Sequence, residues 1–236
     1  MLAHAETRLH DPWLARVIEL EDAERQQRSL KRRLNNARLG AFKPLADFDW
    51  AWPTKCDRPL LQELFSLAFI DDAANVVLIG PNGLGKTLLL KNLTHTAGLH
   101  GHTARFTLAA DILHDLAAQD PSTSLTRRLR RYTRPAVLAI DEVGYLAYDA
   151  RYADLLFEVV SRPYQQQRPL LLTTHKAFAE WNPIFPNAAC VVTLIDRLGH
   201  RAELVALEGK SYRLKEAEER AARNANARPA NARKAS

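Results

Sequence analysis

The chain of 236 residues contains only two cysteines and a single methionine. Cys56 and Cys190 lie far apart and outside any C-x-x-C pair, which excludes a disulfide scaffold and a zinc ribbon and favours a reducing compartment. No apolar run approaches the roughly 20 residues needed to cross a bilayer. The first residues also lack the basic-then-apolar order of a signal peptide. We therefore expect a cytoplasmic protein that does not enter a membrane.

Acidic residues are missing from three stretches that are rich in basic ones. The net charge is +6, and it is concentrated in residues 25–43, 127–134 and 220–236, none of which holds a carboxylate. Such clusters raise the local potential and typically face phosphate backbones, although a solvated helix face is the alternative. The end of the chain is rich in Ala, Asn and Arg, so we expect residues 216–236 to be disordered. The candidate DNA contacts are Arg28, Lys31, Arg32, Arg33, Arg127, Arg128 and Arg131.

The rest of the chain divides into a helical N-terminal part and an α/β part. Apolar spacing predicts a helix from Pro12 to about Ala37, and a proline-rich linker follows it. We place the domain boundary between residues 58 and 59, with the α/β domain over 59–215. Four apolar strands alternate there with helices, which indicates a parallel sheet covered on both faces. The expected strands are 75–79, 104–108, 136–140 and 169–174, and the expected helices are 60–70, 86–97, 110–118 and 152–164.

A phosphate-binding motif stands between the first of these strands and a helix. Residues 80–87 fit G-x-x-x-x-G-K-[ST] in full, and the flanking strand and helix are the context that the motif requires. Glycines allow main-chain N–H groups to surround a phosphate, and the helix N-terminus adds positive potential. We expect Lys86 to reach the β- and γ-phosphates of ATP and the Thr87 hydroxyl to bind Mg²⁺. The predicted nucleotide contacts are Gly80, Pro81, Asn82, Gly83, Leu84, Gly85, Lys86, Thr87 and Leu88.

Polar residues end two of the later strands. Asp141 and Glu142 follow an apolar strand, at the edge where parallel sheets bind ligands. We expect Asp141 to hold Mg²⁺ and Glu142 to polarise the water that attacks the γ-phosphate. His175 ends the next strand, which should lie between the strands of the phosphate loop and the acidic pair. It is a candidate donor to the γ-phosphate, and a capping or solvent-facing histidine is the alternative.

An arginine near the end of the α/β part is the last catalytic candidate. Arg197 follows an apolar run, and a guanidinium at a subunit edge can reach the γ-phosphate of a neighbouring subunit. A surface pair with Asp196 is the other interpretation, and Arg201 is a rival for the same role.

Taken together, these motifs resemble the IstB-like ATPases, AAA+ helper proteins of insertion-sequence transposition that are related to DnaC-type helicase loaders. The resemblance covers about residues 10–215. It rests most on Asp141-Glu142-Val143-Gly144-Tyr145-Leu146, on Phe178-Ala179-Glu180-Trp181 and on Ser211-Tyr212-Arg213-Leu214. It implies an AAA+ P-loop ATPase with a small helical N-terminal domain that oligomerises on duplex DNA and engages an IstA-like transposase. Arg197 matches the arginine that acts in trans in that family, and the basic N-terminal segment would contact DNA or a neighbouring protomer.

The sequence departs from the family pattern in two places. His175 stands where asparagine is usual, and Asn82 and Leu84 stand where proline and threonine are commoner. Two other functions stay open on the sequence: a DnaC-like loader of a replicative helicase, and a DNA-binding scaffold with a weakly active nucleotide site. The altered strand end at His175 is the support for the scaffold.

Overall fold

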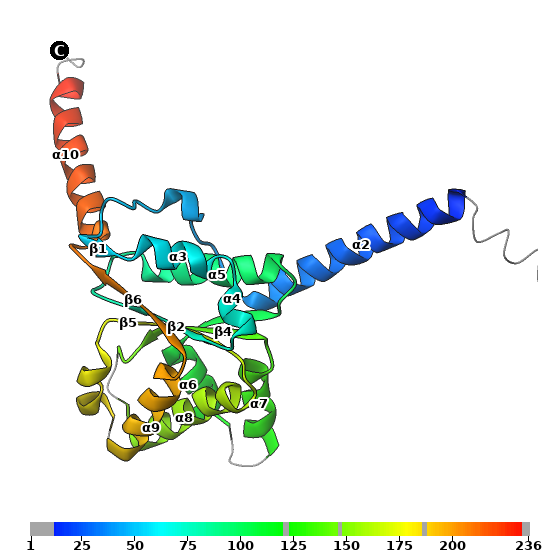
Figure 1. The fold of residues 1–236 in the computed structure, drawn as a ribbon. Helices are drawn as coiled ribbons and strands as arrows, with labels where there is room; N and C mark the ends of the chain where they lie inside the picture. The colour runs from blue at the N-terminus through cyan, green and yellow to red at the C-terminus, as the bar shows by residue number, and fades with distance from the viewer. Residues whose placement is uncertain (1–11, 120–122, 146–147, 186–187, 233–236) are drawn as a thin grey trace, which may run out of the picture.

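The computed structural model describes residues 12–119, 123–145, 148–185 and 188–232. It shows one α/β body from which two helices project (Figure 1). The N-terminal residues 1–11, the end of the chain after 232, and Leu146 of the family-like run lie outside the described residues.

The body is built on a six-stranded sheet in the order β1-β6-β2-β5-β4-β3. The five strands from β6 to β3 are parallel, and the short β1 runs antiparallel to β6. This confirms the predicted parallel sheet, and β5 lies between β2 and β4 as expected. Strands β1 and β6 were not predicted. The bounds are β1 Lys55–Cys56, β2 Asn75–Ile79, β3 Ala104–Leu108, β4 Val137–Val143, β5 Leu170–Thr174 and β6 Ala202–Glu208.

Helices cover both faces of the sheet, which explains why its central strands contain runs of consecutive apolar residues. Val77 on β2 is buried on the face of α6–α9, whereas its neighbours Val76 and Leu78 are buried on the face of α5 (Figure 1). The bounds are α3 Arg58–Leu64, α4 Ala68–Asp71, α5 Lys86–Leu99, α6 Ala109–Ala117, α7 Thr123–Thr133, α8 Ala150–Gln165 and α9 Ala188–Gly199, with short 3-10 helices at Leu45–Asp47, Phe178–Glu180 and Asn182–Ile184.

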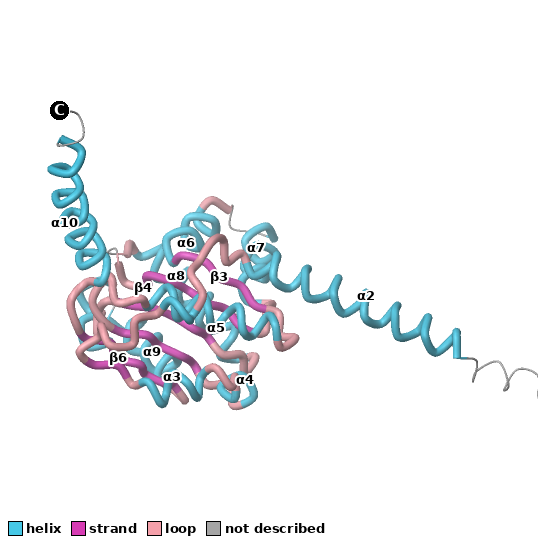
Figure 2. The backbone as a smooth tube through the Cα atoms, turned by 90° about the horizontal axis from the view of Figure 1, so that it is seen from above, coloured by secondary structure: helices cyan, strands magenta, loops and turns pink. Residues whose placement is uncertain are grey.

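Helix α2, Pro12–Ala37, matches the predicted N-terminal helix. Its C-terminal end packs on α5 and β3, while the rest projects from the body (Figures 1 and 2). Among the described residues before 59, the buried side chains are Ala37, Leu39 and Phe48, and all three belong to the core cluster that includes α5. The boundary at 58/59 therefore divides the sequence but not the hydrophobic core.

Two expectations about helices were wrong, and one helix was not predicted. Residues 216–232 are not disordered but lie in α10, Tyr212–Ala232, because Ala, Arg and Glu are strong helix formers. The helix expected over 60–70 is broken into α3 and α4 where Leu67 takes a φ of 68°. The basic residues 127–133 belong to a helix, α7, that was not predicted. In the described ranges, no helix combines the length and the apolar character that a membrane crossing requires.

Candidate functional site

The phosphate loop runs from the end of β2 into α5, and three glycines determine its path. Gly80, Gly83 and Gly85 have φ values of 150°, 83° and 85°. A Cβ on Gly80 would lie 2.1 Å from the Leu207 carbonyl oxygen, and one on Gly85 would lie 2.7 Å from the Phe48 ring. Both the backbone conformation and the packing therefore require glycine at these positions.

Lys86 is the first residue of α5, and its ammonium is folded back under the loop. The side chain is buried, and Nζ donates hydrogen bonds of 2.6 Å to the Gly80 carbonyl and 2.7 Å to the Pro81 carbonyl. Burial lowers the pKa of Lys86, and the charge of Asp141 opposes that shift. The cation is therefore held where the loop would receive an anion.

The acidic pair stands at a break in the pairing of β4 with β5. The register is irregular between Ile140 and Val143, and Glu142 has a φ of 62°, which is uncommon outside glycine. Asp141 is 1% exposed, whereas Glu142 is exposed. The irregularity thus lets two adjacent carboxylates take different environments, one fixed in the protein and one open to the cleft.

Thr173 on β5 connects the two acidic residues. Its hydroxyl donates to Asp141 Oδ1 at 2.5 Å and accepts the main-chain N–H of Glu142 at 2.9 Å. Sequence reasoning did not select Thr173. The signal was present, because Thr173 and Thr174 are polar residues in a strand whose other members are leucines.

His175 lies directly after β5 and lines the same cleft. Its ring contacts the Tyr145 ring edge-on at a centroid distance of 5.6 Å. Burial lowers its pKa below the usual 6.5, and the charges of Lys176 and Lys86 lower it further. The imidazole is therefore neutral at pH 7 in the protein without nucleotide.

These groups face a cleft of about 430 Å³. Residues 82–88 line it, together with Asp141, Glu142 and His175, whereas Gly80 and Pro81 lie behind it and contact Lys86. Two walls were not predicted. One is the linker, including Phe42, Phe48 and Trp52, and the other is the start of α10, including Tyr212, Arg213 and Glu216.

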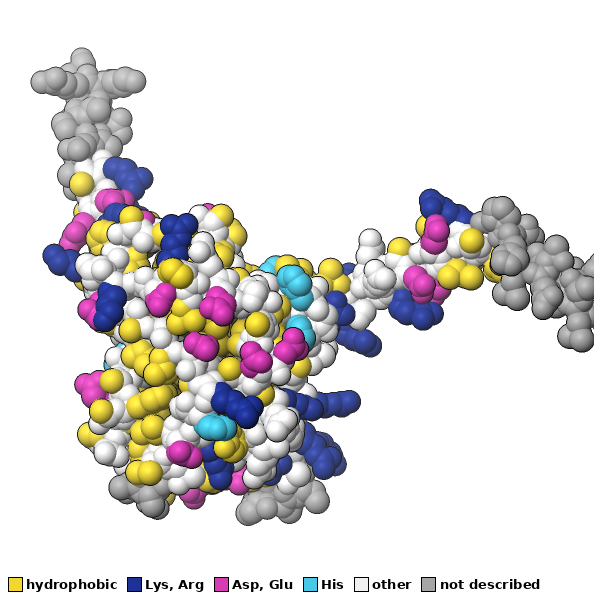
Figure 3. Space-filling view, viewed as in Figure 1, with side chains coloured by type: hydrophobic (Ala, Val, Ile, Leu, Met, Phe, Trp, Pro, Cys, Tyr) yellow, Lys and Arg dark blue, Asp and Glu magenta, His cyan; other side chains and the backbone are white. Residues whose placement is uncertain are grey.

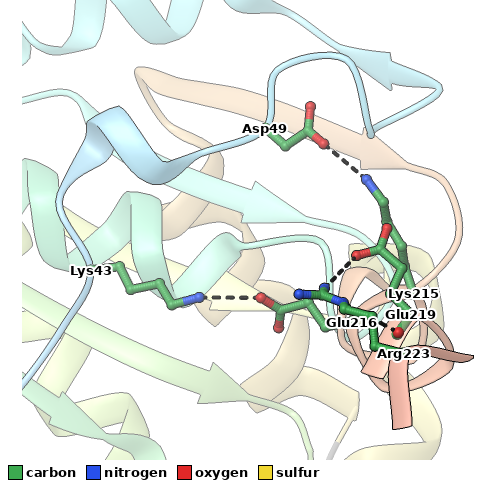
Figure 4. Close-up of polar contacts among 6 residues, drawn as sticks. All are labelled: Lys43, Asp49, Lys215, Glu216, Glu219 and Arg223. Carbon is green, nitrogen blue, oxygen red and sulfur yellow. Dashed lines mark hydrogen bonds and ion pairs between the residues drawn. The ribbon is translucent and has the colours of Figure 1, made fainter. Parts of the chain in front are cut away.

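The linker and α10 are joined across the cleft by a pair of ion pairs, which we call the clasp. Lys43 Nζ lies 3.3 Å from Glu216 Oε1, and Lys215 Nζ lies 3.2 Å from Asp49 Oδ2 (Figure 4). The Trp52 indole N–H also donates to the Lys210 carbonyl at 2.7 Å. The Lys43–Glu216 pair is exposed and the Lys215–Asp49 pair is half-buried, so water screens both pairs and the clasp can open without a large cost.

Helix α10 also begins directly on the phosphate loop. The Tyr212 main-chain N–H donates to the Gly83 carbonyl at 2.9 Å, and a Cβ on Gly83 would lie 2.1 Å from Ser211 Oγ. Arg213 lines the cleft, and its charge lowers the pKa of Lys86. The only sequence signal for this cation was its place in the run Ser211-Tyr212-Arg213-Leu214.

Arg197 lies on α9 and does not line the cleft of its own chain. Its guanidinium stacks 4.5 Å over the Phe157 ring and donates to the Ser161 hydroxyl, both on α8. No ion pair among the described residues joins it to Asp196. Arg201, the rival candidate, is exposed.

The buried side chain of Asn75 ties the helix of Arg197 to the sheet. Its amide donates to the Arg197 and Leu198 carbonyls at 3.1 and 3.0 Å and accepts the Leu170 N–H at 2.9 Å. The end of α9 is therefore fixed to the beginnings of β2 and β5.

The predicted DNA contacts divide into two groups. Arg28 pairs with Glu24 at 2.8 Å, Arg33 donates to the Gly98 carbonyl at 3.0 Å, and Arg128 lies 3.4 Å from Asp115. These three are engaged within the chain. The remaining four are exposed and form no ion pair within the part of the chain that the structure describes: Lys31, Arg32, Arg127 and Arg131.

A phosphate loop, an acidic pair and a polar strand end, brought together on neighbouring parallel strands, define a P-loop nucleotide-binding protein of the AAA+ type. The solved structures agree on the fold. DnaI superposes with a TM-score of 0.60 at 16% identity, over 72% of this chain and 92% of that one. The DnaC helicase loader superposes with a TM-score of 0.52 at 17% identity, over 75% of this chain and 99% of that one.

Within that class, the chain belongs to the IstB-like ATP-binding proteins, whose sequence profile matches residues 3–220. It is 35% identical over 207 residues to a protein of insertion sequence IS5376 from Geobacillus stearothermophilus. This alignment covers 88% of this chain and 82% of that protein. It is 34% identical over 204 residues to a protein of insertion sequence IS21 from Pseudomonas aeruginosa. That alignment covers 86% of this chain and 77% of the relative. The resemblance predicted from the motifs is thereby confirmed.

Proposed function

We propose that this protein hydrolyses ATP with Mg²⁺, assembles on duplex DNA and acts with a transposase in the cytoplasm. The observation that carries the proposal is the convergence of Lys86, Asp141 and Glu142 on one cleft in a chain of the IstB-like family. Its relatives belong to insertion sequences, which supports transposition as the setting.

The residues of the cleft suit a magnesium–triphosphate complex. Thr87 and Asp141 both line it and offer the oxygen ligands that Mg²⁺ prefers. We expect them to hold the ion, which would bridge and neutralise phosphate oxygens. The Thr173 hydroxyl fixes the carboxylate of Asp141 for this role.

Hydrolysis would then depend on three side chains of the cleft. Lys86 would exchange its two loop carbonyls for phosphate oxygens, and the loop N–H groups would receive the rest of the charge. Glu142, exposed at the cleft, would orient the attacking water. His175, neutral at pH 7, would donate a ring N–H to the γ-phosphate.

The position of Arg197 supports an oligomeric ATPase. Because Arg197 packs against α8 outside the cleft of its own chain, any nucleotide that it contacts would be a neighbour's. Helix α2 offers a surface for self-association, because Trp13, Val17 and Leu20 on its projecting part are 63%, 49% and 54% exposed.

Mass photometry of the protein with ATP, with duplex DNA, and with both tests the assembly. We expect the largest particles only when both are present, since each of them would stabilise the same assembly. A monomer under all conditions would contradict the proposal. Steady-state ATP hydrolysis measured on the same samples separates a failure to assemble from a failure to turn over ATP.

A titration of His175 tests its role at the phosphates. In the nucleotide-free protein, the pKa of His175 lies below 6.5. Just below pH 6.5, His175 therefore binds more protons in the unfolded chain than in the folded protein. The free energy of unfolding consequently falls as the pH drops through that window. A bound triphosphate should raise the pKa, because negative charge stabilises the imidazolium. Nuclear magnetic resonance of the ring nitrogens, with His175→Asn to assign the signal, measures this. A pKa that ATP leaves unchanged would place His175 away from the phosphates.

A helicase-loading function is the second candidate, since the fold matches a DnaC helicase loader over 99% of that chain. Affinity capture with the transposase and the replicative helicase offered together distinguishes the helicase-loading function from the transposition function. Selective binding of the helicase would favour the loader. ATP binding without turnover would instead favour the scaffold.

A further inference from the structure

An arginine on the edge strand of the sheet has an unmet hydrogen-bond donor. Arg105 lies on β3, and its Nε is buried with no partner in the described part of the molecule. The guanidinium lies 4.9 Å above the Tyr132 ring of α7, and the Tyr132 hydroxyl donates to Asp115 at 2.6 Å. The ring therefore holds Arg105 in place without neutralising it.

Two further arginines surround this position, from elements that are distant in the sequence. Arg38 directly follows α2 and Arg131 lies on α7, and both are exposed. Burial lowers the pKa of Arg105, and the charges of Arg131 and Arg38 lower it further. The nearby carboxylate of Asp115 is already engaged by Tyr132 and Arg128. Three arginines thus lie near one edge of the sheet, because α2 packs on β3 and the Tyr132 ring of α7 contacts Arg105.

The fold joins here the two basic clusters that the sequence shows separately. Lys31 and Arg32 lie on α2 and Arg127 lies on α7, so both helices carry further exposed cations besides Arg38 and Arg131. Figure 3 shows Lys and Arg side chains gathered on the side of the body below α2. A row of cations fits an extended polyanion better than a single small anion, which would need one point of contact.

We propose that Arg38, Arg105 and Arg131 form a seat for backbone phosphates of duplex DNA. The proposal rests on the DNA-bound assembly proposed above and names the site of contact. A guanidinium presents a planar fork that binds phosphate oxygens in pairs. A backbone phosphate would pair with the exposed Arg38 and Arg131 and would relieve the unfavourable effect of their charges on Arg105. Because backbone phosphates carry no base identity, the seat would position DNA without selecting its sequence.

The test is the salt dependence of duplex binding, measured by fluorescence anisotropy with ATP present. Arg38→Gln and Arg131→Gln change exposed side chains, and Arg105→Gln is added to give the triple variant. Each lost phosphate contact should reduce the slope of log affinity against log salt by about 1. We expect reductions of about 2 for the double variant and about 3 for the triple. Lys55→Gln, at the opposite edge of the sheet, removes one cation outside the seat; it is the control for the loss of a single charge and should keep the wild-type slope.

Thermal melting and ATP binding of each variant show that it is folded, and the double variant tests the seat if the triple one does not fold. A wild-type slope in the double variant would overturn the seat while leaving the proposed function intact. A loss equal to that of Lys55→Gln would also overturn it, because net charge alone would then explain the effect. A wild-type protein that binds no duplex would overturn both.

Discussion

Replacing Lys86 by alanine is expected to lower the rate of ATP hydrolysis by about 100-fold or more, as for other donors that stabilise a transition state. Lys86 is buried beneath the loop, and its two present partners are loop carbonyls. The substitution therefore removes the one ammonium placed to receive the charge of the γ-phosphate. Steady-state release of phosphate at saturating ATP, with and without duplex DNA, measures the loss.

Lys91→Ala is the matched control for that experiment. Lys91 also lines the cleft, but its Nζ contacts the Ala41 carbonyl at 3.4 Å and lies 4.7 Å over the Phe106 ring. We expect near-normal hydrolysis from this variant. If Lys86→Ala kept wild-type turnover while Lys91→Ala lost it, the assignment of the catalytic lysine would be wrong.

Replacing Arg197 by alanine is expected to reduce turnover by about 1,000-fold, the lower end of what a trans-acting arginine supplies. ATP affinity should stay close to the wild-type value, because Arg197 does not line the cleft of its own chain. The decisive measurement mixes this variant with Lys86→Ala. One subunit then supplies an intact cleft and the other an intact arginine, so mixed assemblies should regain activity that neither variant has alone.

Arg201→Ala provides the comparison, since Arg201 is the nearest rival and is exposed. It should hydrolyse ATP at close to the wild-type rate. Normal turnover by Arg197→Ala alone would remove the trans role and leave Arg197 as a packing residue on Phe157 and Ser161. If both variants are inactive and their mixtures stay inactive, Arg197 does not complete the cleft of a neighbouring subunit.

Local patterns predicted most of the central fold. The strands and helices around residues 75–99 were recoverable because an apolar run, a glycine turn and an amphipathic helix each leave a short-range signal. Strand β6 was missed because only Val205 and Leu207 among its residues are buried, so it lacks the continuous apolar run of a central strand. Helix α7 was missed because four of its eleven residues from Thr123 to Thr133 are arginines, so the segment was described only as a basic cluster, with a solvated helix face as the alternative.

The candidate site was predicted where one chain segment carries the chemistry. Lys86, Thr87, Asp141 and His175 were all found this way, and the structure brings them to one cleft. The linker wall and Arg213 were not found, because their position depends on contacts between segments more than 100 residues apart, such as Lys215 with Asp49. Such contacts leave no periodicity for a sequence pattern to show.

The packing of Phe48 on Gly85 has a consequence for how such proteins exchange parts during evolution. The linker supplies more than a connection, since the Asn92 amide also donates to the Lys43 carbonyl at 3.0 Å. A gene fusion joined after residue 58 would import a foreign segment where the phosphate loop needs its own cover. A fusion joined within the projecting part of α2, before Ala37, would keep that cover and the core side chains Ala37 and Leu39, and would replace only projecting residues. The position at which gene segments can be exchanged therefore lies before the linker. Lineages that exchanged N-terminal arms should share the segment from Phe42 to Trp52.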